Sequence, residues 1–252
     1  MIIESDMGNT RSKWRALDND VVVARGDQLN DAGLQGVVSL AGRVKQPAEQ
    51  ALPMRVGGFG GMAGLAAYLK AEGVTHVVDA THPFAAEMSG NAVRACAEVG
   101  VPLLALTRAP WVAEAGDSWQ HVADIDGAVA ALQGEAKRVM LAVGRMHLQA
   151  FAVNPQHFYL LRLVDAPDSA LPFPQHEAVV ARGPFSLEGD VALMREHGVE
   201  LVVAKNAGGS GARAKIDAAR QLGLPVLMID RPQIPARFEA HSVAEVMRWL
   251  KH

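Results

Sequence analysis

Short apolar, β-branched runs alternate with longer amphipathic stretches along most of this chain. The run Val74–Val78 is typical of them, since a buried strand is short, apolar and β-branched. Strand patterns that alternate with helix patterns indicate parallel α/β units. Strands are therefore expected over residues 37–40, 75–79, 102–106, 139–143, 158–164, 200–204 and 225–229. Helices are expected over residues 60–72, 84–99, 125–132, 187–197, 212–222 and 243–250.

The alternation breaks once, around residues 107–116, where Pro110 and Gly116 interrupt it. It restarts beyond that point with the same logic. A chain of 252 residues is long enough for two modest domains. We expect an α/β protein of two doubly wound domains, residues 1–108 and 109–252, with parallel sheets flanked by helices and a ligand cleft between the domains.

Composition excludes several classes of protein. The formal net charge is −3, so no global basic field favours nucleic acid. No apolar run approaches the roughly 18 residues that span a bilayer, and the start lacks the basic and apolar regions of a secretion signal. The one cysteine, Cys96, excludes an intramolecular disulfide and fits a small core residue on a helix. The nine histidines form no metal-ligand pattern, so we expect no metal. Because neither a membrane span nor a secretion signal is evident, we expect a cytoplasmic protein.

The most informative segment is residues 79–85, Asp-Ala-Thr-His-Pro-Phe-Ala, where a buried strand should end and a helix begin. In open α/β sheets, ligands bind at the carboxyl ends of strands. Asp79, Thr81, His82 and Pro83 are therefore candidate ligand-binding residues, with Thr81 or His82 as a helix cap and Pro83 in the first turn. The alternative interpretation is an ordinary helix cap with incidental polar residues.

One further strand end and a glycine turn suit a phosphorylated nucleotide. Ser39 lies near the end of the strand at 37–40 and Arg43 follows it, at a place where an arginine favours the 2′-phosphate of NADP over the free hydroxyl of NAD. Gly42 lies beside them, and the turn that holds Gly58 and Gly60 lets the backbone approach a ligand at a helix start. A surface arginine and a simple tight turn are the alternatives.

The second half of the chain carries cations at its strand ends. Lys205, Asn206 and Gly208 follow the strand at 200–204 in a glycine-rich loop that suits an anionic ligand. Other cations near loops would suit a substrate with several carboxylates, although most charged surface residues are simply solvated. This set is Arg145, Arg162, Arg182, Arg213, Lys215 and Arg231.

These motifs, in this order, resemble the precorrin-6A reductase family of cobalamin biosynthesis. The matching stretches include VVSLAGR (37–43), RVGGFGG (55–61), VVDATHPFA (77–85), LTRAPW (106–111), ARGPF (181–185) and AKNAGG (204–209). The resemblance implies two Rossmann-like domains with NADPH and a tetrapyrrole between them. It implies reduction of one double bond of precorrin-6A to give precorrin-6B. It also implies a small-molecule substrate, no nucleic acid or membrane, and transient contact with neighbouring pathway enzymes.

The first 35 residues depart from that family pattern. Residues 6–14, Asp-Met-Gly-Asn-Thr-Arg-Ser-Lys-Trp, resemble the phosphate loop of type III pantothenate kinases. In the reductase pattern only Gly8 and Thr10 fit the loop for the cofactor's pyrophosphate. If residues 6–14 are the phosphate loop of a pantothenate kinase, residues 21–25 would be a hairpin strand rather than part of a helix.

The residues and the resemblance agree on hydride transfer from NADPH to the macrocycle. Asp79, Thr81 and Pro83 join Ser39, Gly42, Arg43, Gly58 and Gly60 as predicted cofactor contacts, and the second half supplies cations for the substrate's carboxylates. His82 is the candidate proton donor because its unperturbed pKa is near 6.5, and solvent is the alternative donor. Two other functions remain open: a non-catalytic NADP-binding sensor, and a Mg²⁺-dependent phosphotransferase acting through residues 6–10. Binding of ATP but not NADPH would favour the phosphotransferase.

Arg43 generates the first testable prediction. A contact between arginine and phosphate is charge-assisted, so Arg43→Ala should weaken NADPH binding by about 1.5–3 kcal/mol. NADH has no 2′-phosphate, so its affinity should barely change. Titrations of the purified variant with both nucleotides measure the difference, and equal losses would show that Arg43 does not recognise the phosphate.

Overall fold

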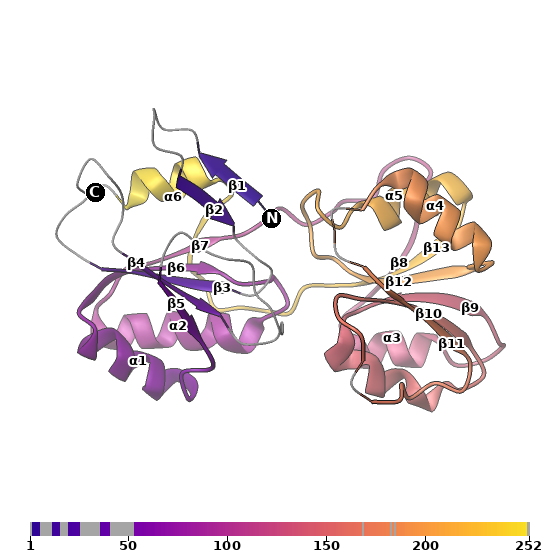
Figure 1. Cartoon of the computed structure of the whole chain (residues 1–252), viewed down its shortest axis with the longest axis horizontal. Helices are drawn as coiled ribbons and strands as arrows, with labels where there is room; N and C mark the ends of the chain where they lie inside the picture. The colour runs from indigo at the N-terminus through magenta and orange to yellow at the C-terminus, as the bar shows by residue number, and fades with distance from the viewer. Residues whose placement is uncertain are drawn as a thin grey trace. The chain divides into compact units, whose positions relative to one another are not determined.

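The computed structural model describes residues 2–5, 12–15, 20–25, 36–40, 53–167, 169–181, 183 and 185–250, with side chains from residue 36 onward. The chain divides into two compact units (Figure 1). The first unit contains Met1–Arg108 together with Gln233–His252, and the second contains Ala109–Pro232. The predicted α/β fold class is confirmed by both units, and the predicted ligand cleft stays a prediction.

The first unit is built on a six-stranded sheet of order β14-β7-β6-β3-β4-β5. Helices α1 (Gly61–Ala71) and α2 (Ala86–Val99) cover one face, and α6 (Val243–Trp249) lies on the other (Figure 1). The strands are β3 (Asp20–Arg25), β4 (Gly36–Leu40), β5 (Met54–Val56), β6 (Val74–Ala80), β7 (Leu103–Leu106) and β14 (Phe238–Ala240). A separate antiparallel pair is formed by β1 (Ile2–Ser5) and β2 (Ser12–Arg15).

Strand β3 runs antiparallel to both of its neighbours, β4 and β6, so this sheet is not purely parallel as predicted. Val22 lies opposite Val38 on one side and Val78 on the other. The connection offers a physical reason. Residues 26–35 separate β3 from β4, which is fewer than the dozen or so residues that a parallel crossover needs. A strand is found over residues 21–25 as predicted, but it lies inside the sheet.

The second unit holds a fully parallel six-stranded sheet of order β11-β10-β9-β12-β13-β8. Helix α3 (Ile125–Ala131) and the 3₁₀ segment η1 (Arg145–Val153) lie on one face, and α4 (Leu187–Glu196) and α5 (Ala214–Leu222) lie on the other (Figure 1). The strands are β8 (Ser118–Val122), β9 (Arg138–Ala142), β10 (Phe158–Leu163), β11 (His176–Val180), β12 (Leu201–Lys205) and β13 (Pro225–Ile229). The pattern did not predict β8 or β11, which are edge strands with largely exposed side chains.

The end of the chain belongs to the first unit, so the predicted second domain of residues 109–252 is wrong at its C-terminal end. Strand β14 pairs in parallel with β7, with Glu239 opposite Ala105. Ala240 and Val246 pack in one apolar cluster with Val78, Leu104 and Leu106. Because the alternation of strand and helix continues unbroken past residue 232, no local pattern marks this return.

Side-chain caps explain where several helices begin. Asp124 accepts a hydrogen bond from the Gly127 amide at 2.8 Å at the start of α3. Ser186 and Ser242 cap α4 and α6 in the same way, over 3.1 and 3.2 Å. Such caps satisfy amides that have no partner inside the helix, and each stabilises the helix by about 1 kcal/mol.

Small residues let α2 pack closely on its sheet. Ala92, Ala95 and Cys96 are buried there beside Leu65 and Val77. Burial, and next to it the negative charge of Asp79, raise the pKa of the Cys96 thiol to about 12. Among the described residues, no helix is long and apolar enough to cross a membrane, and no three potential metal ligands cluster.

The raised pKa of Cys96 predicts an inert thiol. The thiolate is the reactive form, and a thiol with an ordinary pKa of about 8.5 would be partly ionised at about pH 8. Because its pKa lies near 12, Cys96 should remain neutral and unlabelled by a thiol reagent in the native protein and react only after unfolding. Mass spectrometry of native and urea-treated samples checks this, and rapid labelling of the native form would contradict it.

Candidate functional site

The loop that follows β6 is folded around the carboxylate of Asp79. This side chain is fully buried, with 0% exposed. Its Oδ1 accepts hydrogen bonds from the Thr81 amide at 3.1 Å and from the Thr81 hydroxyl at 2.7 Å. Thr81 Oγ1 lies 3.0 Å from the hydroxyl of Ser89 on α2. A single buried carboxylate thus ties the end of β6 to the start of the following helix.

Arg237 is a residue of this site that the sequence analysis missed. It donates a hydrogen bond from Nη1 to Asp79 Oδ2, and only 8% of its side chain is exposed. Arg237 lies just before β14, 158 positions from Asp79 along the chain. No local motif announces this contact, because it depends on the return of the chain to the first unit.

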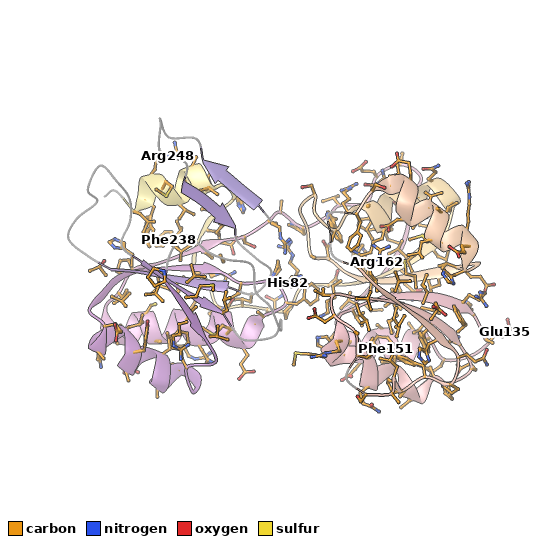
Figure 2. All side chains as sticks on the ribbon, viewed as in Figure 1. His82, Glu135, Phe151, Arg162, Phe238 and Arg248 are labelled. Atoms are coloured by element: carbon orange, nitrogen blue, oxygen red, sulfur yellow. The ribbon has the colours of Figure 1, made fainter. Side chains whose placement is uncertain are left out.

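His82 lies in the same loop and is partly buried (Figure 2). Its Nδ1 accepts a hydrogen bond from the Phe84 amide at 3.2 Å. An imidazole nitrogen that accepts carries no proton, so the neutral ring holds its proton on Nε2. Helix α2 begins after Ala85, which makes no side-chain cap, so the predicted capping by Thr81 or His82 is wrong. Pro83 is buried beside His82.

Ser39, at the end of β4, is joined to the glycine turn by Arg55. Arg55 donates to Ser39 Oγ at 3.2 Å, to the Gly57 carbonyl at 2.6 Å and to the Gly58 carbonyl at 2.8 Å. Its guanidinium also lies over the Phe59 ring, 3.9 Å from the centroid. Arg55 was not predicted as a site residue, although an arginine two positions before a glycine-rich turn is a local signal that could have found it.

The glycine turn leaves open space in front of its backbone. Gly57, Gly60 and Gly61 have φ of +117°, +80° and +81°, a region that favours glycine. A Cβ built on any of them, or on Gly58, would meet nothing within 4 Å. Gly60 directly precedes α1, so a ligand atom can approach the amides at the start of this helix.

Five predicted site residues lie outside the described part of the chain. These are Gly8, Thr10, Gly42, Arg43 and Arg182.

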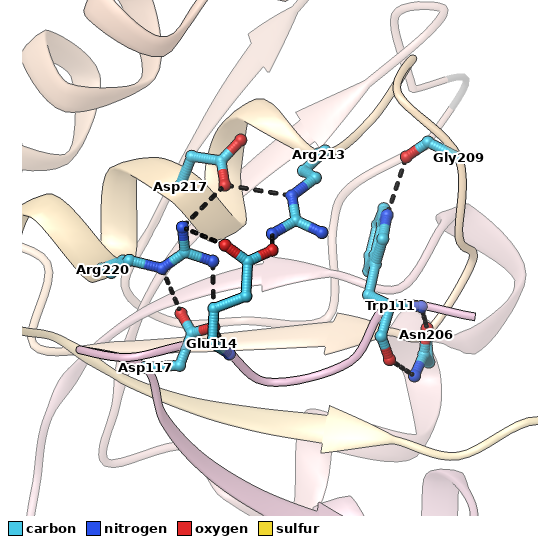
Figure 3. Close-up of polar contacts among 8 residues, drawn as sticks. All are labelled: Trp111, Glu114, Asp117, Asn206, Gly209, Arg213, Asp217 and Arg220. Carbon is cyan, nitrogen blue, oxygen red and sulfur yellow. Dashed lines mark hydrogen bonds and ion pairs between the residues drawn. The ribbon is translucent and has the colours of Figure 1, made fainter. Parts of the chain in front are cut away.

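In the second unit, Asn206 holds its loop to the segment that enters the unit. Its Oδ1 accepts from the Trp111 amide at 2.7 Å, and its Nδ2 donates to the Trp111 carbonyl at 3.0 Å (Figure 3). The indole of Trp111 in turn donates to the Gly209 carbonyl at 2.7 Å. Both ends of the Asn206 amide are used within the protein, which favours a holding role over the predicted contact with substrate.

Gly208 is required by close packing of the same loop. Its φ is +70°, and a Cβ there would lie 2.2 Å from the Ala109 carbonyl oxygen and 2.4 Å from Arg231 Nη2. Arg231 donates to the carbonyls of Asn206 and Ala207 at 2.9 and 3.1 Å. Arg231, which the sequence placed among the candidate substrate-binding cations, therefore closes the loop from the end of β13.

Lys205 and Arg145 lie at, or shortly after, the carboxyl ends of two neighbouring strands. Lys205 ends β12, and Arg145 begins the segment after β9, with Ala204 opposite Ala142 in the register. The carboxyl ends of parallel strands meet at one edge of a sheet, so both cations belong to the same edge. This edge can offer two positive charges to an anionic ligand.

Two other candidate cations are paired inside the second unit. Arg162 on β10 (Figure 2) forms an ion pair with the buried Asp190 and lies over the Phe185 ring, 4.0 Å from its centroid. Arg213 pairs with Glu114 and Asp217 (Figure 3). Arg162 joins strand β10 to helix α4, and Arg213 joins the segment at Glu114 to helix α5, which favours a structural role for each.

Arg220 completes the network of Figure 3. It contacts Asp117 at 2.9 Å and Glu114 at 3.2 Å. Burial is the largest single influence and raises the pKa of Asp117. The hydrogen bonds from Arg220 and the Glu114 amide, with the charge of Arg220, together outweigh it and hold that pKa below its usual value. The network attaches residues 114–117 to helix α5.

Each of the two units is an α/β sheet with polar loops at the ends of its parallel strands. In α/β proteins of this class, small ligands bind at the carboxyl ends of the strands. The family model described as "Precorrin-6x reductase CbiJ/CobK" matches residues 23–251, and the chain belongs to this family. The resemblance seen in the sequence is therefore confirmed. The kinase-like residues 6–14 precede the matched range.

Several relatives carry consistent names. The chain is 58% identical over 222 residues to the "Precorrin-6A reductase" of Rhodobacter capsulatus, with 88% of each chain covered. It is 43% identical over 219 residues to the protein of the same name from Rhodococcus erythropolis, covering 86% of this chain and 88% of the relative. A solved structure, "CobK precorrin-6A reductase", superposes with a TM-score of 0.82 at 59% identity, covering 85% of this chain and 86% of that one.

Gly208→Ala should destabilise the second unit. An alanine at positive φ is strained, and its Cβ would collide with the Ala109 carbonyl, so the loss should exceed about 1 kcal/mol. Gly211→Ala is the matched control, because φ there is not left-handed and a Cβ would meet nothing within 4 Å. Urea unfolding of both variants measures the difference, and equal stabilities would contradict the packing described for Gly208.

Proposed function

We propose that this chain uses NADPH to reduce one double bond of precorrin-6A, giving precorrin-6B in cobalamin biosynthesis. The observation that carries the proposal is the family match over residues 23–251, together with 58% identity to a protein named precorrin-6A reductase. The geometry of the strand-end loops in both units is consistent with it. Membership of a reductase family favours catalysis over a non-catalytic sensor.

The first unit fits the nucleotide. Its glycine turn has open space before the amides of α1, which suits a phosphate. Ser39 lies at the neighbouring strand end and is held there by Arg55. Gly8, Thr10, Gly42 and Arg43 remain proposed contacts from the sequence pattern. The bound nucleotide would supply the hydride.

The loop after β6 contributes to the same site through Thr81 and Pro83. Asp79 was predicted as a direct contact, but its carboxylate is buried and serves Thr81 and Arg237. We therefore assign Asp79 the role of holding the loop in which Thr81, His82 and Pro83 face the ligand.

The second unit fits the substrate's carboxylates. Lys205 and Arg145, at the ends of neighbouring strands, are assigned to bind them, and Arg182 is a further proposed contact. Asn206 and Gly208 support these cations by holding the loop close to Ala109 and Trp111. Charge-assisted hydrogen bonds from Lys and Arg to carboxylates are among the strong ones.

His82 is the proposed donor of the proton that must accompany the hydride. Donation requires the imidazolium, which carries a proton on both nitrogens. It would transfer the Nε2 or the Nδ1 proton to the substrate carbon, and loss of the Nδ1 proton leaves the neutral ring described here, in which Nδ1 accepts from the Phe84 amide. Solvent is the alternative donor.

The direct test is an anaerobic assay of NADPH oxidation with precorrin-6A, with NADH as the control. We expect oxidation that depends on the tetrapyrrole, a reduced product heavier by the mass of the two added hydrogens, and a clear preference for NADPH. Binding of ATP but not NADPH, with no reduction, would reject the proposal.

The proton-donor role of His82 predicts that His82→Ala lowers kcat by about 10²–10⁴, the usual contribution of a general acid. His82→Asn is the matched control, since an Asn oxygen can accept from the Phe84 amide in place of Nδ1 but cannot titrate. Equal losses in both variants, with a changed pH profile, support proton donation. Wild-type turnover in the Asn variant would instead leave His82 a loop-holding residue.

A further inference from the structure

The C-terminal segment contacts the loop after β6 through one buried ion pair. Arg237 lies only a few residues after the chain returns to the first unit at residue 233. Its guanidinium contacts Asp79 Oδ2, and the two side chains are 8% and 0% exposed. Its Nε lies 3.5 Å from Glu239 Oε1. The negative charge of Asp79 is therefore paired with a positive charge from a residue distant in sequence.

The contact continues from Asp79 into the ligand loop. The opposite oxygen of the carboxylate accepts from the amide and the hydroxyl of Thr81, and that hydroxyl contacts Ser89 on α2. The chain of hydrogen bonds thus runs from Arg237 through Asp79 and Thr81 to Ser89. Thr81 and Ser89 are 9% and 0% exposed, so water does not replace these partners easily.

The C-terminal segment is held independently of Arg237. The Thr107 amide donates to the Ala240 carbonyl at 3.0 Å, and His241 Nδ1 lies 3.1 Å from the Thr107 carbonyl oxygen. Ala240 and Val246 also pack in the apolar cluster with Leu104. Removal of the guanidinium should therefore leave β14 in place and act mainly on Asp79 and its loop.

Stability alone explains this ion pair poorly. Two buried charges lose their hydration, and well-packed apolar residues often stabilise a protein as well or better. The pair does fix the orientation of the Asp79 carboxylate. Arg237 binds Oδ2, so that Oδ1 faces Thr81.

We propose that Arg237 is a positioning residue for the ligand loop, acting through Asp79 to hold Thr81, His82 and Pro83 in place for the nicotinamide nucleotide. The choice of ligand rests on the proposed function. The inference that Arg237 holds the loop depends only on the hydrogen bonds of Asp79, and it can be tested without any ligand.

The test compares Arg237→Met with Arg220→Met. The control variant breaks another ion pair to a buried carboxylate, Asp117, whose side chain is 1% exposed, and this pair lies in the second unit, outside the proposed ligand-binding residues. Hydrogen–deuterium exchange of the full chain should show faster exchange over residues 79–85 in Arg237→Met only. The dissociation constant for NADPH should rise by about tenfold or more in Arg237→Met, the scale of a lost charged hydrogen bond, and stay unchanged in the control.

Arg237→Lys and Asp79→Asn keep the test decisive if Arg237→Met does not fold. The lysine keeps the charge but not the planar fork, so it should restore part of the NADPH affinity. Asp79→Asn should weaken NADPH binding by about tenfold or more, and adding Arg237→Lys to it should change the affinity little further.

Unchanged exchange over residues 79–85 and unchanged NADPH affinity in the folded variants would overturn the inference. Faster exchange with unchanged NADPH affinity would overturn the nucleotide-positioning role. A wild-type protein that binds no NADPH would instead reject the proposed function, while the exchange experiment would still decide whether Arg237 holds the loop.

Discussion

The carboxylate of Asp79 is the constraint on which the first unit's site depends. A fully buried charge must be paired and hydrogen-bonded, or its burial costs several kcal/mol. Arg237 supplies the opposite charge, and the amide and hydroxyl of Thr81 supply the hydrogen bonds. These contacts, with that of Thr81 to Ser89, bring together the end of β6, the first turns of α2 and a segment near the C-terminal end of the chain.

The second unit holds its loop with hydrogen bonds from side chains to backbone groups. The loop after β12 is held by the Asn206 amide against the backbone of Trp111, and by Arg231 against two carbonyls of the loop. Gly208 allows the backbone to lie against Ala109. In both units, residues that looked like ligand contacts from their position are engaged in holding a loop. His82 and Lys205, which are assigned to the ligands, are neighbours in sequence of the holding residues Asp79 and Asn206.

The family match begins within the strand that gives the first sheet its mixed topology. The match begins at residue 23, inside β3, and this strand runs antiparallel between two strands of an otherwise parallel sheet. The strand lies between β4 and β6, the two strands whose ends carry Ser39 and Asp79.

The sequence by itself determined the α/β class, the break near residue 108, most internal strands and the family, because these depend on local apolar periodicity and on motifs in order. It also indicated the loop at residues 79–83. Only the tertiary structure decided that residues 233–252 return to the first unit, that β3 runs antiparallel to β4 and β6, and that Arg237 forms an ion pair with Asp79. Strand partners and ion pairs between distant residues follow from how the elements pack, and a local pattern carries no record of which distant residue will face a buried charge.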